Sequence, residues 1–300
     1  MPAPALMVLA TFLFATMGVC VKLASDLYAA SEIVMYRGLV GSIMMALLSH
    51  RQGLSLKTSL PGMHLWRSIS GVTSLCLWFY AIGKLPLATA MTLNYMSSVW
   101  MALFLLGGAV LMGARKLDWR LVAAVLLGFA GVALILRPTL DQQQLWHGLA
   151  GLLSGMIAAM AYLQVTALGR AGEPELRVVF YFSVGGCLAG ALITAVGEGG
   201  LHAHSLWGAA LLLAVGVLAT TAQVCLTRAY GTGKPLVNAC LQYLGIVFSF
   251  GYGMLLFKDA LTWQATLGMV LIIGAGLAAT LLRSRVPQAA RDSQFNPAES

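Results

Sequence analysis

The composition of this 300-residue chain excludes a soluble globular protein. Hydrophobic residues make up 59% of the sequence and charged residues only 9%, whereas a soluble domain carries about 25% charged residues. A net charge of +8 would suggest nucleic-acid binding in a soluble chain. In so apolar a sequence it indicates instead the excess of Lys and Arg on the cytoplasmic loops of a membrane protein. We therefore expect the lipid bilayer as its partner, and no nucleic acid.

Apolar runs of about 20 residues, the length at which a helix crosses a bilayer, follow one another along nearly the whole chain. The first run lacks the basic segment and the cleavage site of a signal peptide, so it is predicted to remain as a helix. Ten spanning helices are predicted, at 4–24, 32–49, 65–83, 86–112, 118–136, 146–169, 176–196, 206–228, 235–257 and 263–283. The polar tail at 284–300 is predicted to be disordered and cytoplasmic.

Basic residues fall unevenly on the loops between these helices. Thirteen Lys and Arg residues, Arg67 among them, lie on alternate loops, at the span ends beside those loops or in the tail. Four lie on or beside the intervening loops, and Arg37 is the only cation counted as lying inside a span. Because Lys and Arg accumulate on the cytoplasmic side, both termini are predicted to be cytoplasmic, in a multi-pass protein of the inner membrane. No proline interrupts the middle of a span, so we expect continuous helices.

Two sequence patterns recur in the second half of the chain. The segment YAIGKLP at 80–86 resembles YGTGKP at 230–235, and KLDW at 116–119 resembles ALTW at 260–263. The repeat divides the chain into spans 1–5 (residues 1–142) and spans 6–10 (residues 143–283). Because five is odd, the second half must enter the membrane in the opposite direction. The predicted fold is therefore an all-α integral membrane protein of two inverted five-helix repeats.

This layout resembles the drug/metabolite transporter superfamily, and specifically its ten-helix EamA-type exporters, over residues 5–283. In detail the chain is most similar to the bacterial exporters of aromatic and other neutral amino acids. It departs from the family pattern in two places. The family's proline in the middle of span 4 is replaced by Ser97 and Ser98, and its Gly-Glu pairs before spans 5 and 10 are absent. The resemblance implies a cavity surrounded by spans 1, 3, 4, 6, 8 and 9.

The fourth span, at 86–112, is uncharged but rich in polar groups. At helical spacing, Asn94, Tyr95 and Ser98 share one face. An amide and a phenol at this depth are costly beside lipid, so they should face other helices or a water-filled cavity. Two interpretations stay open. These residues bind cargo, or they form hydrogen bonds between helices, worth about 0.6 kcal/mol each on average.

Further cargo-binding candidates lie on spans 3, 6, 8 and 9. They are Ser74, Trp78, Tyr80, Tyr162, Gln223, Asn238 and Gln242. For Trp78 and Tyr80, an aromatic belt at the membrane interface is an equal alternative. Arg37, more than one turn inside span 2, is a candidate partner for a substrate carboxylate, although pairing with Glu32 is the simpler explanation.

No acidic residue lies at the centre of a predicted span. Because proton-coupled transporters keep an ionisable group there, the sequence favours a neutral or zwitterionic cargo carried without proton coupling. No catalytic motif, metal-ligand spacing or cofactor motif is present, so we expect no enzyme activity, no cofactor and no metal. The predicted function is export of small metabolites, above all amino acids, by a monomer or homodimer that works by alternating access. The alternatives are a broad-specificity drug exporter, a nucleotide-sugar carrier, and a membrane enzyme or scaffold.

Overall fold

The computed structural model describes residues 2–97, 99–101, 103–104, 107, 119–136, 142–197, 200–232, 241–259 and 262–283. The candidates Ser98 and Asn238 and the predicted tail lie outside these ranges. The described residues form helices and no strands. The helices are α1 (Ala3–Ala24), α2 (Ala30–Arg51), α3 (Pro61–Lys84), α4 (Leu87–Tyr95), α6 (Trp119–Leu136), α7 (Gln142–Arg170), α8 (Glu175–Val196), α9 (Leu206–Thr232), α11 (Leu244–Leu256) and α12 (Trp263–Arg283).

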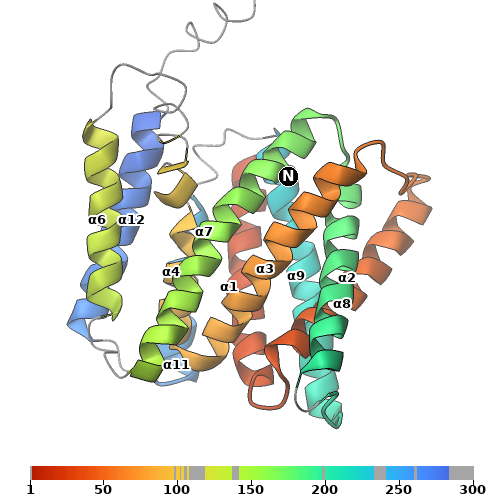
Figure 1. The fold of residues 1–300 in the computed structure, drawn as a ribbon, viewed down its shortest axis with the longest axis horizontal. Helices are drawn as coiled ribbons and strands as arrows, with labels where there is room; N and C mark the ends of the chain where they lie inside the picture. The colour runs from red at the N-terminus through yellow and green to blue at the C-terminus, as the bar shows by residue number, and fades with distance from the viewer. Residues whose placement is uncertain are drawn as a thin grey trace, which may run out of the picture.

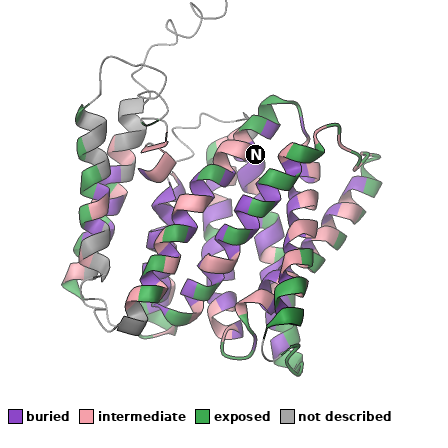
Figure 2. Cartoon of the chain, in the orientation of Figure 1, coloured by how far each residue is buried: buried purple, intermediate pink, exposed green. Residues whose placement is uncertain are grey.

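The helices have the length and surface of membrane spans. In the described part, α1, α2, α8, Leu145–Arg170 of α7 and Leu206–Tyr230 of α9 are long and apolar enough to cross a bilayer. Exposed residues lie on the outward faces of the helices and buried residues on the inward faces (Figure 2). Large apolar side chains such as Leu188 and Leu255 are exposed, whereas polar side chains such as Gln223 are buried. This distribution suits lipid outside the bundle and polar groups inside it. The chain is therefore a multi-pass membrane protein.

The main helix pairs join the first part of the chain to the second. α1 packs on α9, α2 on α8 and α3 on α7, while α6 and α12 pair with each other at one edge of the bundle (Figure 1). In the α2–α8 pair the backbones touch at small residues. A Cβ on Gly190 would lie 2.6 Å from the Met35 backbone nitrogen, so only glycine permits this approach.

Two helices are interrupted beside the centre of the bundle at one residue each, Met96 and Tyr243, whose backbones stay in the right-handed helical region. The prediction of continuous helices is therefore wrong at these two residues. α4 ends at Tyr95, and the Met96 N–H is shared between two carbonyls of the preceding turn. Helical bonding resumes when the Trp100 N–H donates to the Met96 carbonyl at 3.0 Å. In the second half of the chain the helical turn that holds residues 241 and 242 is broken at Tyr243, and α11 starts directly after it.

α7 packs closely against the end of α4. A Cβ on Gly155 of α7 would lie 2.6 Å from the Leu93 carbonyl oxygen and 2.8 Å from that of Asn94. The α7 backbone therefore presses directly against the carbonyl groups at the end of α4. Such close contact between a glycine and carbonyl oxygens is common where membrane helices pack tightly.

Candidate functional site

A cavity of about 60 Å³ lies between the helices, with room for several waters or one or two small functional groups. Residues of α1, α2, α3, α4, α7, α8 and α9 line it, together with Gln242 just before α11. The lining residues are Phe14, Arg37, Arg67, Gly71, Ser74, Leu75, Trp78, Asn94, Tyr95, Ala158, Ala161, Tyr162, Phe182, Gln223 and Gln242. We call this cavity the central pocket.

Most of the candidates chosen from the sequence meet in the central pocket. They are Arg37, Ser74, Trp78, Asn94, Tyr95, Tyr162, Gln223 and Gln242. The pocket also involves α2 and α8, which the resemblance did not place around the cavity. Tyr80 does not line the pocket. Its side chain is exposed and packs against His147, because two residues along a helix turn it away from the face that holds Trp78.

A chain of hydrogen bonds fixes one wall of the pocket. The Asn94 amide on α4 donates to the Ser154 hydroxyl at 3.0 Å, and the Ser74 hydroxyl on α3 donates to the Ser154 carbonyl at 2.8 Å. All three side chains are buried. Since α7 accepts bonds from both α3 and α4, the wall holds three helices in fixed register around the pocket.

Aromatic and amide groups form the opposite wall. The Tyr230 hydroxyl donates to the Gln242 side-chain oxygen at 3.3 Å, and the rings of Tyr162 and Tyr230 stack with centroids 6.5 Å apart. The Tyr95 ring lies against Gly245 of α11, where any larger residue would overlap the phenol. The two interrupted segments therefore meet at the pocket.

Two arginines point into the pocket, although sequence reasoning placed only one inside a span. Arg67, near the start of the predicted span 65–83, was counted with the loop charges, but α3 begins at Pro61, so Arg67 lies in its second turn and is buried. A proline at the first helical position is a signal that would have placed this start correctly. Pairing of Arg37 with Glu32 is not observed, because Glu32 contacts His202 and the Ala29 N–H instead.

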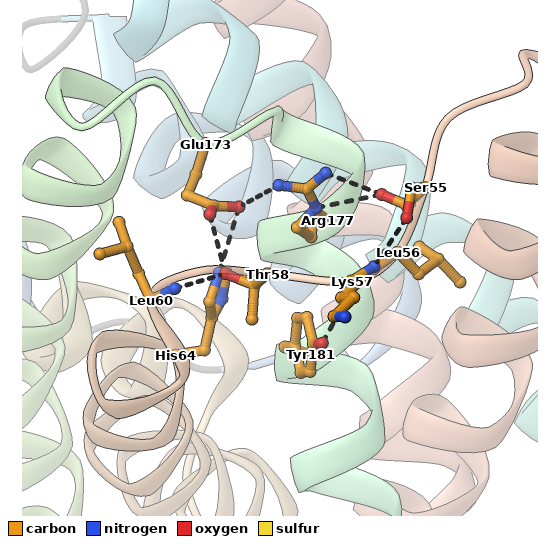
Figure 3. Close-up of polar contacts among 9 residues, drawn as sticks. All are labelled: Ser55, Leu56, Lys57, Thr58, Leu60, His64, Glu173, Arg177 and Tyr181. Atoms are coloured by element: carbon orange, nitrogen blue, oxygen red, sulfur yellow. Dashed lines mark hydrogen bonds and ion pairs between the residues drawn. The ribbon is translucent and has the colours of Figure 1, made fainter.

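At one end of the bundle, a cluster of polar contacts ties the α2–α3 loop to the α7–α8 loop (Figure 3). Glu173 accepts a hydrogen bond from Thr58 at 2.8 Å and one from Arg177 at 3.0 Å, and it lies 3.3 Å from His64. Arg177 also donates to the Ser55 carbonyl at 2.8 Å. We call this group the Glu173 cluster.

The Glu173 cluster favours the charged form of its carboxyl group. Burial alone raises the pKa of Glu173, but the hydrogen bonds from Thr58 and Arg177, the nearby imidazole of His64 and the positive charge of Arg177 together outweigh burial, so the pKa lies below its usual value. At the other end of the bundle, Glu32 contacts both the backbone and the side chain of His202 in the α8–α9 loop. A carboxylate therefore joins the two halves of the chain at each end.

Comparison with known proteins places this arrangement in context. The model of the EamA-like transporter family matches residues 1–137. Over 281 residues, the chain is 34% identical to the pseudopaline exporter CntI of Pseudomonas aeruginosa, covering 91% of this chain and 94% of that protein. Over 279 residues, it is 25% identical to an uncharacterized transporter of Helicobacter pylori, covering 91% of this chain and 92% of the relative.

More distant similarity extends to a human carrier and to a protein of known structure. Human solute carrier family 35 member G1 is 22% identical over 287 residues, covering 91% of this chain and 77% of the carrier. A solved crystal structure superposes with a TM-score of 0.67 at 20% identity, covering 95% of this chain and 99% of the other. At this identity the structural match supports the fold alone.

Proposed function

Because the chain belongs to the EamA-like transporter family of the drug/metabolite transporter superfamily, we propose that it exports small amino-acid-like metabolites through the central pocket. The observation that carries this proposal is that one polar pocket lies among helices from both halves of the chain, beside the interruptions at Met96 and Tyr243. A substrate site in the interior of the bundle, between two repeats, is typical of transporters of this architecture.

The helix packing supports two inverted repeats. In such a repeat α1 would correspond to α7, α2 to α8, α3 to α9, α4 to α11 and α6 to α12. The α1–α9 pair then corresponds to α7–α3, and α1–α11 corresponds to α7–α4, and each of these pairs packs together. The α2–α8, α4–α11 and α6–α12 pairs each correspond to themselves. A pseudo-two-fold axis of this kind lets the halves rock around a fixed site, so alternating access is the mechanism we propose.

The proposed orientation places the α2–α3 and α7–α8 loops in the cytoplasm, as the distribution of Lys and Arg predicts. The Glu173 cluster then closes the cytoplasmic end of the pathway, and the contacts of Glu32 close the external end. Rocking of the halves requires that the contacts at one end of the bundle break while the contacts at the other end remain. The similarity to an exporter supports outward transport. No carboxylate lines the pocket in the described part of the chain, which favours uniport or exchange over proton antiport.

Flux into liposomes that contain the purified protein tests this function. The probes are labelled aromatic, aliphatic and acidic amino acids, each measured with and without a proton gradient and against protein-free liposomes. We expect saturable flux of at least one amino acid, at a rate that does not depend on the gradient. Flux of unrelated drugs with none of any amino acid would contradict the proposal and favour a broad-specificity exporter. Flux that requires the gradient would contradict the uncoupled mechanism.

A further inference from the structure

The central pocket carries positive charge that the protein does not neutralise. Arg37 is 4% exposed and Arg67 is 3% exposed, and the ion pairs formed among the described residues include neither side chain. An arginine inside a membrane helix is costly unless it is paired or reaches water. Two buried cations side by side without a partner are therefore costly unless something else supplies the negative charge.

Among the described residues of the pocket, the buried groups that lack a hydrogen-bond partner are all donors. The buried atoms of its lining residues that lack a hydrogen-bond partner, within the part of the chain described, are Nε of Arg37, Nε and Nη1 of Arg67, Nε1 of Trp78 and Nε2 of Gln242. All five are N–H donors. The arginine and tryptophan atoms carry no ambiguity, because these side chains have no acceptor. A pocket with spare donors and excess positive charge suits a ligand rich in anionic acceptors.

The two guanidinium groups are held in place without using those donors. Both lie against the ring of Phe182 on α8, with ring-centroid distances of 5.0 Å for Arg37 and 4.2 Å for Arg67. Arg67 also folds over Gly71, where a Cβ would overlap its Nη1 atom. Cation–π contact stabilises the charge but leaves the N–H groups free to bind a ligand.

We propose that Arg37 and Arg67 form an anion-binding pair, and that the cargo is an amino-acid-like metabolite with at least two carboxylates and a net negative charge. The inference rests on the proposed transport function and replaces the neutral or zwitterionic cargo expected from the sequence. Each guanidinium matches one carboxylate with two parallel hydrogen bonds. Because α2 and α3 belong to one half of the chain and Phe182 to the other, the bound carboxylates sit where the halves meet.

Counterflow in liposomes with two matched probes tests the pair. Labelled L-glutamate and L-glutamine have nearly the same shape and differ by one negative charge. We expect wild-type protein to carry glutamate faster than glutamine. Arg37→Gln and Arg67→Gln should each lower the glutamate-to-glutamine flux ratio by about 10- to 100-fold, the range for loss of a charge-assisted hydrogen bond. Arg170→Gln, which removes an exposed arginine at the end of α7, is the control and should leave the ratio unchanged.

The outcomes separate the two proposals. Glutamine or leucine flux without glutamate flux would overturn the anion-binding pair and leave the transport function standing. Absence of flux for every amino acid would overturn the transport function itself. Faster flux of glycerol 3-phosphate than of glutamate would overturn the carboxylate assignment in favour of phosphate.

Thermal unfolding in detergent provides a readout that a merely structural role would not produce. Removing an uncompensated buried cation should leave the melting temperature of Arg67→Gln equal to or above that of the wild type. Added glutamate should raise the melting temperature of the wild type and of Arg170→Gln, but not that of Arg67→Gln. A large fall in the melting temperature of Arg67→Gln without ligand would mean that Arg67 is a structural group and would overturn the proposal.

Discussion

The side-chain amide of Asn94 donates a 3.0 Å hydrogen bond to the hydroxyl of Ser154, which joins α4 in the first half of the chain to α7 in the second. The bond lies next to the interruption at Met96 and on the wall of the central pocket. Asn94 thus belongs both to the contact between the halves and to the surface that faces cargo.

Replacing Asn94 or Gln242 with leucine should abolish transport while leaving expression intact. Leucine replaces the amide that faces the pocket with methyl groups that form no hydrogen bonds, so we expect at least a tenfold loss of flux for each variant, about the value of one hydrogen bond to a charged group. Flux per reconstituted molecule is the measurement. Thr221→Ala, which alters an exposed hydroxyl of α9, serves as the control. Normal transport by both leucine variants would show that the pocket is not the cargo site.

Gly155→Ala should destabilise the contact between α4 and α7. The new methyl group would lie 2.6 Å from the Leu93 carbonyl oxygen, and backbone atoms cannot yield as a flexible side chain does. Overpacking of this kind costs about 1–3 kcal/mol. Melting temperature in detergent is the readout. Gly169→Ala, on the same helix but with open space around its Cβ position, should be neutral or slightly stabilising. Equal melting temperatures for the two variants would contradict the described packing.

Gly71→Ala should weaken the selection of acidic cargo. The added methyl group overlaps the guanidinium of Arg67 and lies 2.9 Å from the Phe182 ring, so Arg67 must leave its position. We expect the glutamate-to-glutamine flux ratio to fall about tenfold, as for loss of one charge-assisted contact. Gly186→Ala is the matched control, because its Cβ would meet only ordinary contacts at 3.8 Å or more. An unchanged ratio for Gly71→Ala would show that the position of Arg67 does not affect selection.

The Glu173 cluster should make stability depend on pH. The pKa of Glu173 is lower in the folded protein than its usual value, which is about 4.3 in the unfolded chain. Its contribution is therefore complete above the unfolded pKa and disappears as the pH falls through the folded pKa. We expect the melting temperature of Glu173→Gln to lie below that of the wild type near neutral pH, with the difference shrinking as the solution is acidified.

The pH prediction has a close control. Glu175→Gln makes the same change two residues away, at a partly exposed carboxylate in the first turn of α8. Its melting temperature should follow that of the wild type across the pH range. A difference between wild type and Glu173→Gln that does not shrink as the pH falls below the unfolded pKa of about 4.3 would mean that the charged form of Glu173 does not stabilise the fold.

Helical periodicity was enough to predict much of the pocket, because a polar side chain in an apolar span avoids lipid and faces other helices or a cavity. It failed for Arg67 because the start of α3 was placed after Pro61 and the arginine was grouped with loop charges. Arg67, Gly71, Ser74 and Trp78 follow one another at spacings of four, three and four residues. That stripe along one face of α3 is the signal that would have placed Arg67 beside the other candidates.

The interruptions of α4 and α11 were not predictable from a search for proline. At α4 the feature that accompanies the interruption lies in another helix, since Gly155 of α7 permits the close contact with the Leu93 and Asn94 carbonyls. One local signal does exist. The segment LNYM at 93–96 matches LQYL at 241–244, and both interruptions fall within these segments. A match of polar residues between the two halves thus pointed to the same place as the structure.

The accessibility of Ala158 tests most directly whether one pocket serves both sides of the membrane. Ala158 is 6% exposed and lines the pocket from α7. An Ala158→Cys variant, made in a background with the native cysteines replaced, is treated with a membrane-impermeant maleimide in right-side-out and in inside-out vesicles. Alternating access predicts labelling from both sides, slowed from both sides by transported cargo. Labelling from one side only would contradict the account.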